Sequence, residues 1–374
     1  MATENPTTSA SNSVTIRTGA LEYLEEHLAP MMSRCSHVCV ISDNTVFSQY
    51  GERVTEQIKL LNLPQSKILI PQGEAAKTLE IAKLCWEQME QAQLDRRSIV
   101  IALGGGTVCD IAGFAASCFM RGIDCIHIPT TLLAMCDAAI GGKTGVNLGS
   151  RKNLIGTFHQ PKAIIIDPAC LTSLPDRELR SGLAEVIKYG VINDADLLSS
   201  LENNMESLLA RDPAALTSVI ETAAHIKCAV VEQDFHDKGA RVYLNFGHTF
   251  SHALEGLTDY KHYLHGEAVA IGMCCAAQLS KQLGFIDETV VERVEAICIK
   301  AGLPTKLPNV SDDALTEKMT QDKKTQRGTI TCIVINGIGD VMKLDNIASQ
   351  IVKEALHAKR KRDARAEATT SATL

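Results

Sequence analysis

The alternation of short apolar runs with amphipathic stretches over residues 14–175 constrains the fold of this chain more than any other feature. Short runs bounded by turn or polar residues, as strands are, lie at residues 38–42, 67–71, 98–103, 125–129 and 163–167. Between two of them, residues 78–94 carry apolar side chains at near-helical spacing. Alternating strands and helices predict βαβ units around a mainly parallel sheet. We therefore predict a doubly wound, Rossmann-like nucleotide-binding domain over residues 14–175.

Beyond residue 175 the pattern changes to long helical segments. These are expected at residues 178–189, 194–210, 214–234, 249–258, 266–283 and 288–301. One late strand at residues 329–335 is expected to pair with residues near Val341. Because 374 residues exceed what one hydrophobic core usually serves, we predict a second, mostly α-helical domain over residues 176–357.

The two ends are predicted to lie outside these domains. Residues 1–13 are rich in Ser and Thr and are expected to form a disordered leader. Residues 358–374 begin with a Lys/Arg cluster and continue with Ala, Thr and Ser, which predicts a helix end that frays into a solvated tail.

Composition excludes several classes of protein. A hydrophobic fraction of 45% with 22% charged residues is typical of a folded globular chain. The net charge of -7 argues against nucleic acid as the main partner, because no excess of basic residues is present to neutralise phosphates. Thirteen Cys without a Cys-x-x-Cys pair indicate a reducing compartment. With no signal peptide or membrane-spanning run recognised, we expect a cytoplasmic protein with no membrane partner.

A set of Glu and His residues predicts a metal site. His248 and His252 are four residues apart and share a face if the segment is helical. Glu185 and His265 lie in two further motifs, so a Glu and two His can be assembled. Three protein ligands with one position open are typical of catalytic zinc. A metalloprotease is excluded because Thr249 takes the place of Glu in His-Glu-x-x-His. A single His on an apolar face is more often a packed core residue.

A Gly-rich turn, Gly104-Gly105-Gly106, follows the run at residues 98–103 and precedes a helical segment. Backbone amides at such a helix start can approach a pyrophosphate closely, and the helix adds favourable partial charge. The dinucleotide fingerprint is incomplete, because Cys109 stands where the third Gly belongs. A plain tight turn is the alternative.

Three further groups of polar residues are candidates for anion binding. The loop at residues 141–147 resembles a phosphate-binding loop but has Asp137 in place of its leading Gly, so a solvated turn is the alternative. Lys143, Lys152 and Asn153 can donate hydrogen bonds to a substrate phosphate. Lys227 and Arg241 can bind a carboxylate, and Lys324 is a further candidate, although each could equally be a surface charge.

Taken in order, these segments resemble the sugar phosphate cyclases, and most closely the 3-dehydroquinate synthase family. The resemblance runs from about Val38 to Asp340, and its strongest motifs are Gly104-Gly105-Gly106 with Asp110, Met120-Arg121-Gly122-Ile123, Pro129-Thr130-Thr131-Leu132-Leu133, residues 141–147, 182–189 and 245–252, and His265-Gly266-Glu267. It implies a lyase that holds NAD as a catalyst and a divalent metal, normally zinc with cobalt as a possible substitute. The implied substrate is the sugar phosphate 3-deoxy-D-arabino-heptulosonate 7-phosphate, which becomes 3-dehydroquinate with loss of phosphate.

The resemblance also assigns roles to residues. It implies that Glu185, His248 and His265 bind the metal. It places His252, Lys143, Asn153, Lys324 and Arg121 at the phosphate, with Arg121 coming from the partner subunit of a homodimer. It places Lys227 and Arg241 at the carboxylate, and Asp137, Lys188 and Asn245 at the hydroxyls. The residues implied for NAD are Gly105, Gly106, Asp110, Asp43, Asn44, Glu74, Lys77, Thr130, Thr131, Lys152 and Glu178, with Ser173 where the family often has Thr beside the cofactor. Phe235 and the pair Ala138-Ala139 depart from the family pattern.

Three alternatives remain at this point. A sibling cyclase would make an inosose, a valiolone or aminodehydroquinate. Arg241 and Lys227 argue against the first two, because an uncharged substrate would leave two buried cations unpaired. A metal- and NAD-dependent polyol dehydrogenase would not need the predicted phosphate residues. A nucleotide-binding scaffold without activity would not need the residues predicted to bind the metal, the phosphate and the carboxylate.

Overall fold

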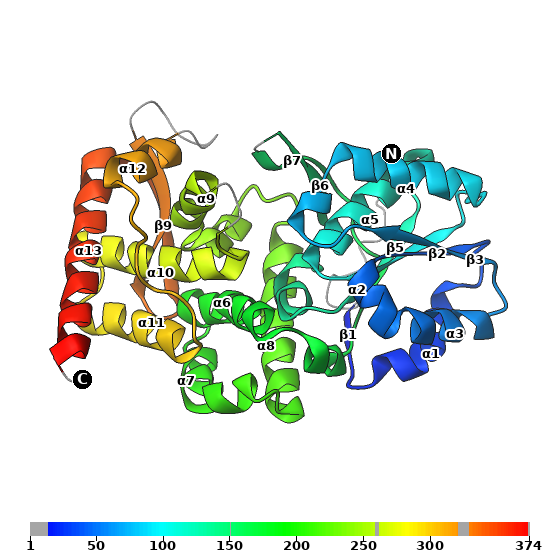
Figure 1. The fold of residues 1–374 in the computed structure, drawn as a ribbon, viewed down its shortest axis with the longest axis horizontal. Helices are drawn as coiled ribbons and strands as arrows, with labels where there is room; N and C mark the ends of the chain where they lie inside the picture. The colour runs from blue at the N-terminus through cyan, green and yellow to red at the C-terminus, as the bar shows by residue number, and fades with distance from the viewer. Residues whose placement is uncertain (1–13, 150, 259–261, 321–328, 373–374) are drawn as a thin grey trace, which may run out of the picture. The chain divides into compact units, whose positions relative to one another are not determined.

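The computed structural model describes residues 14–149, 151–258, 262–320 and 329–372 (Figure 1). The chain forms two compact units, one of residues 1–175 with 211–236 and one of residues 176–210 with 237–374. The predicted leader at residues 1–13 lies outside the described residues.

The first unit is built on a six-stranded sheet in which every neighbouring pair is parallel, in the order β1-β8-β5-β4-β2-β3. Its strands are β1 (Val14–Ile16), β2 (Val38–Asp43), β3 (Gln65–Ile70), β4 (Ile99–Gly104), β5 (Asp124–Pro129) and β8 (Ala163–Ile166). Every residue of β2 and β4 is buried, which is why both read as continuous apolar runs. The predicted doubly wound domain is confirmed.

The strand order reverses beside β2, because the chain moves to β3 on one side and then to β4 on the other. The connecting helices are α1 (Leu24–Leu28), α2 (Asn44–Val46), α3 (Glu52–Leu60), α4 (Leu79–Gln91) and α5 (Gly106–Cys118). Right-handed crossovers require α3 on one face of the sheet and α4 and α5 on the other, as Figure 1 shows. Ligands of such sheets bind outside the carboxyl ends of the strands at this reversal. Asp43 and Gly104 end the two strands that border it.

A β-hairpin of β6 (Lys143–Leu148) and β7 (Arg151–Phe158) follows β5 in the same unit. The predicted loop at residues 141–147 is therefore mostly strand, and the loop prediction is wrong there. The cause is tertiary packing, since β6 lies against α5. A Cβ atom on Gly113 would meet Thr144 Cγ2 at 2.5 Å.

The helix α8 (Pro213–Gln233) packs with the first unit. The two units divide after Pro175, and residues 211–236, predicted from the sequence to belong to the helical domain, are grouped with the first unit. The spacing of apolar residues predicts that a segment is helical, but it does not predict against which domain's core the helix packs. By length and composition α8 is able to cross a membrane, at a mean hydropathy of 1.3, but half of that window is buried inside the structure, as for an ordinary core helix.

The second unit is mostly helical, as predicted. It contains α6 (Asp176–Ile192), α7 (Ala195–Leu209), α9 (His248–Leu257), α10 (His265–Gln282), α11 (Glu288–Lys300), α12 (Asp312–Thr320), α13 (Ser349–Ala372) and the hairpin of β9 (Thr329–Gly337) and β10 (Asp340–Ala348). The helix α10 is buried along most of its length and packs against α6, α9, α11, α13 and β9. A helix that is apolar all round needs such a central place.

The solvated tail predicted at residues 358–374 is contradicted at its start, because α13 continues to Ala372 and Lys359, Arg360 and Arg362 form ion pairs with acidic side chains. Lys359 is 1% exposed. Its Nζ donates to Glu295 Oε1 of α11 at 2.9 Å and to Asp363. Arg362 Nε donates to the other oxygen of Glu295 at 2.6 Å. Lys359 and Arg362 therefore neutralise Glu295 and attach the first part of this segment to α11.

Candidate active site

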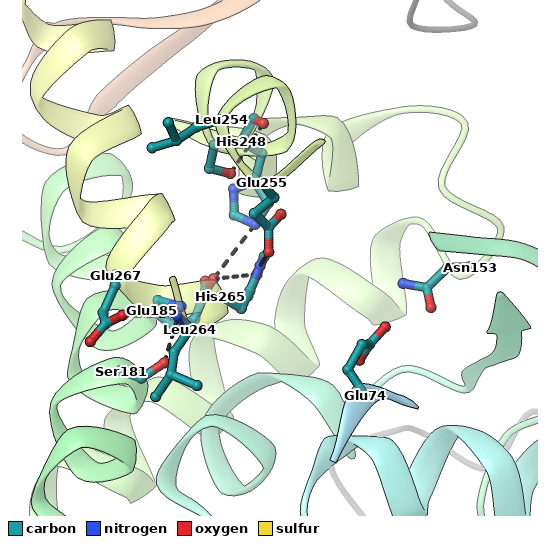
Figure 2. Close-up of polar contacts among 12 residues, drawn as sticks. Glu74, Asn153, Ser181, Glu185, His248, Leu254, Glu255, Leu264, His265 and Glu267 are labelled. Atoms are coloured by element: carbon teal, nitrogen blue, oxygen red, sulfur yellow. Dashed lines mark hydrogen bonds and ion pairs between the residues drawn. The ribbon is translucent and has the colours of Figure 1, made fainter. Parts of the chain in front are cut away.

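Glu185, His248 and His265 come together from three different helices of the second unit (Figure 2). One donor atom of each lies within 4.8 Å of the others. Glu185 Oε1 is 3.5 Å from His248 Nε2 and 3.4 Å from His265 Nε2. One carboxylate and two imidazoles at this spacing are a donor set for a divalent metal with an open position. The geometry therefore fits the metal that was predicted here.

Close backbone contacts between helices create this cluster. Gly266 follows His265, and a Cβ atom there would lie 1.9 Å from the carbonyl oxygen of Ser181. The Gly266 N–H also donates to Ser181 Oγ at 3.0 Å, one helical turn before Glu185. On the other side, a Cβ on Gly272 would lie 2.2 Å from the carbonyl oxygen of Gly247. Glycine at these positions lets α6 and α9 approach α10 closely enough for the three side chains to meet.

Hydrogen bonds orient both imidazole rings. His248 Nδ1 lies 3.1 Å from the carbonyl oxygen of Phe246, to which it donates. His265 Nδ1 lies 3.4 Å from Glu255 Oε1. With each Nδ1 directed to its own acceptor, each Nε2 is the nitrogen that would offer its lone pair to a metal bound beside Glu185.

Burial and charge act differently on the two His. Burial lowers the pKa of His248 to about 3, so the ring is neutral at physiological pH. Burial also lowers the pKa of His265, but hydrogen bonds to Glu185 and Glu255, and their charges, outweigh it and raise the pKa to about 10. The site therefore stabilises positive charge at its centre, which is what a bound cation requires.

Other predicted residues surround this cluster in the same unit. Lys188 is 1% exposed and pairs with Glu185 from the next turn of α6. The His252 ring centroid is 5.5 Å from that of His248. Within the described residues His252 is not part of the three-donor group. Arg241 and Asn245 lie in the 3₁₀ turn η9 (Ala240–Asn245), and Arg241 is buried.

A second polar cluster lies in the first unit. Lys77 Nζ donates to Asp110 Oδ2 at 2.6 Å and also to Asn153 Oδ1. Asn147 links Asn153 to Glu74, because its Oδ1 accepts from the Asn153 N–H at 2.9 Å and its Nδ2 donates to Glu74 at 2.9 Å. Burial raises the pKa of Asp110, whereas the charges of Asp110 and Glu74 outweigh burial and raise the pKa of Lys77. Lys77 and Asn153 are 76 positions apart in the sequence, and the fold brings them together.

The carboxyl edge of the sheet collects the predicted nucleotide residues. Asp43 accepts from the N–H groups of Thr45 and Val46 at 2.9 Å and so caps α2, which begins at Asn44. Gly105 caps α5, and a Cβ on it would lie 3.0 Å from Thr131 Cγ2. The Thr130 N–H donates to the carbonyl of Gly104 at 3.0 Å. The glycines at the start of α5 leave its backbone N–H groups accessible beside the strand reversal. Such a helix start can bind the pyrophosphate of a dinucleotide.

The remaining predicted residues have separate surroundings. Lys227 Nζ on α8 donates to Asp137 Oδ1 at 2.6 Å. Ser173 hydrogen bonds with Tyr50 at 2.5 Å. Burial raises the pKa of Glu178. Lys143 and Lys152 lie on β6 and β7, Gly106 begins α5, Arg121 ends a 3₁₀ turn at a φ of 72°, and Lys324 lies outside the described residues.

Sequence reasoning missed Glu255. It follows His248 by seven residues and His252 by three, so all three share a face of α9. That spacing in the sequence could have identified Glu255 as a neighbour of the metal site. The second missed feature, the contact of Gly266 with Ser181, has no local signal because the two residues are 85 positions apart.

Two family models match adjoining parts of the chain: 3-dehydroquinate synthase N-terminal over residues 67–181 and 3-dehydroquinate synthase C-terminal over residues 182–325. The chain belongs to the 3-dehydroquinate synthase family. A 3-dehydroquinate synthase of Acidithiobacillus ferrooxidans is 44% identical over 330 residues, which cover 88% of this chain and 90% of that protein. One of Nitrosomonas europaea is 42% identical, covering 85% and 86%.

Solved structures confirm the fold class. A 2-epi-5-epi-valiolone synthase from Streptomyces hygroscopicus subsp. jinggangensis with NAD+ and Zn2+ bound aligns with a TM-score of 0.88 at 30% identity, covering 97% of this chain and 99% of that one. A 2-deoxy-scyllo-inosose synthase complexed with carbaglucose-6-phosphate, NAD+ and Co2+ aligns at 0.84 and 26%, covering 93% and 96%. A probable glycerol dehydrogenase from Sinorhizobium meliloti, at 0.63 and 19% identity over 95% and 98%, shares the fold.

Proposed function

We propose that this chain catalyses the 3-dehydroquinate synthase reaction, in which 3-deoxy-D-arabino-heptulosonate 7-phosphate is converted to 3-dehydroquinate and phosphate. The enzyme is then a carbon–oxygen lyase of the shikimate pathway, which leads to aromatic amino acids. The observation that carries the proposal is the Glu185, His248 and His265 cluster in a chain 44% identical to a 3-dehydroquinate synthase over 88% of its length.

NAD and a divalent metal are the proposed cofactors. The valiolone synthase structure holds NAD+ with Zn2+ and the inosose synthase structure holds NAD+ with Co2+, and the donor set of this chain suits either metal. When bound, NAD accepts and returns a hydride while the metal acts as a Lewis acid on the substrate oxygens. We place NAD at the carboxyl edge, on Gly105, Gly106 and Asp110, with Asp43, Lys77 and Thr130 beside it.

The protein's own side chains would bind and orient the substrate. Arg241 suits a carboxylate because its guanidinium forms two parallel hydrogen bonds, and Lys227 adds a second cation. Lys188 and Asn245 would hold hydroxyl groups. Asp137 already accepts from Lys227, so it would position that lysine while it contacts a hydroxyl.

Phosphate binding is assigned to His252, Lys143, Asn153, Lys324 and Arg121. In the structure the Asn153 side-chain oxygen accepts from Lys77 and its backbone N–H donates to Asn147, so the Lys77 contact orients the side-chain amide. A phosphate monoester is itself a proton acceptor near neutral pH, since its second pKa is about 6. We therefore assign no protein side chain as the sole base for phosphate elimination.

We further propose that the enzyme is a cytoplasmic homodimer in which Arg121 of one subunit reaches the phosphate of the other. The reduced state of the cysteines supports the location, because all thirteen are free thiols and most are buried. Sedimentation of the purified protein tests the assembly. A monomer that turns over at full rate would contradict the role of Arg121.

The test of the proposed function is phosphate release from 3-deoxy-D-arabino-heptulosonate 7-phosphate in the presence of NAD and zinc. Release that stops after chelation, without accumulation of NADH, is expected for a cycle that returns its hydride. Absence of release from protein that contains both cofactors would refute the proposal.

A sibling cyclase reaction is the second candidate, because the valiolone synthase aligns at 30% identity over nearly the whole chain. Arg241, at 2% exposed, favours a substrate with a carboxylate, because its guanidinium can form two parallel hydrogen bonds with that group. Sedoheptulose 7-phosphate lacks the carboxylate. Faster turnover of that sugar than of the heptulosonate would favour the sibling reaction.

A further inference from the structure

Glu255 lies behind the metal-ligand cluster, on the side of the His265 ring that faces away from Glu185. It is on α9 and is 1% exposed. Its Oε1 lies 3.4 Å from His265 Nδ1, while Nε2 of the same ring lies 3.4 Å from Glu185 Oε1 (Figure 2). The ring is thus held between two carboxylates, one at each nitrogen.

The two His of the cluster are oriented by different partners. His248 donates to the backbone carbonyl of Phe246. The two residues are close because the chain turns there at the start of α9. His265 has a charged side chain as its partner instead. Its side chain is 35% exposed, against 12% for His248, so packing alone constrains the His265 ring less. Ring orientation at His265 therefore depends on Glu255.

A neutral imidazole has one nitrogen that donates and one that accepts. A carboxylate at Nδ1 keeps the hydrogen there, directs the lone pair of Nε2 to the metal, and makes Nε2 a better donor.

We propose that Glu255 is a positioning residue, which fixes the tautomer and rotation of the His265 ring and strengthens metal binding without contacting the metal. This inference rests on the proposed function for the presence of the metal. It assigns to Glu255 a task that differs from that of the three ligands.

The experiment compares Glu255→Ala and Glu255→Gln with the wild-type protein, using zinc competition with a chromophoric chelator and the visible spectrum of the cobalt-loaded protein. Glu255→Ala is expected to weaken zinc binding about 10- to 100-fold. Glu255→Gln retains an acceptor for Nδ1 and is expected to lose less. The matched control is Glu295→Ala, which removes a carboxylate that pairs with Lys359 in the same unit. Its zinc affinity should equal that of wild type.

Circular dichroism first confirms that each variant is folded. Wild-type zinc affinity and an unchanged cobalt spectrum in Glu255→Ala would overturn the inference, and so would an equal loss in Glu295→Ala. Wild-type protein that binds no zinc would overturn it together with the metal assignment. If zinc binds and Glu255→Ala weakens it but no phosphate is released, the inference holds and the proposed reaction fails.

Discussion

Replacement of Gly266 by Ala tests whether the close contact of α6 with α10 forms the metal site. The added Cβ would lie 1.9 Å from the carbonyl oxygen of Ser181, whereas ordinary contact begins at 3.4 Å. One helix must therefore move by about 1.5 Å, because backbone atoms cannot rotate away. Overpacking of this kind costs about 1–3 kcal/mol in the free energy of unfolding, and occasionally more.

The same movement displaces His265 from Glu185. A functional constellation has to be held within about 0.5 Å of its working geometry, so a shift of this size separates the ligands. Loss of a residue that hydrogen bonds to a metal ligand weakens metal binding about 10- to 100-fold. Zinc affinity of Gly266→Ala is expected to fall by at least that factor.

The assays are urea denaturation and zinc competition on the same preparation. Ser181→Ala is the matched control, because it removes the 3.0 Å hydrogen bond from the Gly266 N–H and leaves the helix spacing unchanged. It is expected to cost about 1 kcal/mol with near wild-type zinc affinity. Wild-type stability and zinc affinity in Gly266→Ala would refute the reasoning that glycine here sets the ligand geometry.

Three other predictions concern buried ionisable groups. Burial lowers the pKa of His127 from 6.5 to about 4, so the unfolded state binds the proton first as pH falls, and stability is lost between these two values. Urea denaturation of wild type should therefore lose about 2 kcal/mol between pH 7 and pH 5 that His127→Gln does not lose; equal losses would contradict this. Lys77→Met leaves the mostly buried Asp110 without its 2.6 Å partner and should cost about 3 kcal/mol, whereas Lys83→Met, at an exposed ion pair, should change the midpoint little. Deletion of residues 358–374 removes Lys359 and its buried ion pairs, and should lower the melting temperature by several degrees. Scanning calorimetry measures this change. An unchanged melting temperature would support the original prediction of a solvated tail.

Much of the fold could be predicted from local pattern. The buried strands β2 and β4 appear as apolar runs, because strands covered on both faces exclude polar residues. The helices of the second unit appear as periodic segments. The motif order gave the family resemblance and with it the three ligands that the structure brings together.

Other features depend on contacts between residues far apart in the sequence. The place of α8 in the first unit follows from which core its apolar face meets, and periodicity carries no such information. The last helix was predicted as a polar end because Glu295, an acidic partner of Lys359, lies on α11, 64 positions away in the sequence.

The sequence by itself thus determined the order of strands and helices, the donor chemistry and the family, because these depend on residue types and on spacing along the chain. Only the tertiary structure decided that Gly266 meets Ser181 and that Glu255 meets His265. Both depend on how closely two helices pack, and that distance is set by side chains that the local pattern does not bring together.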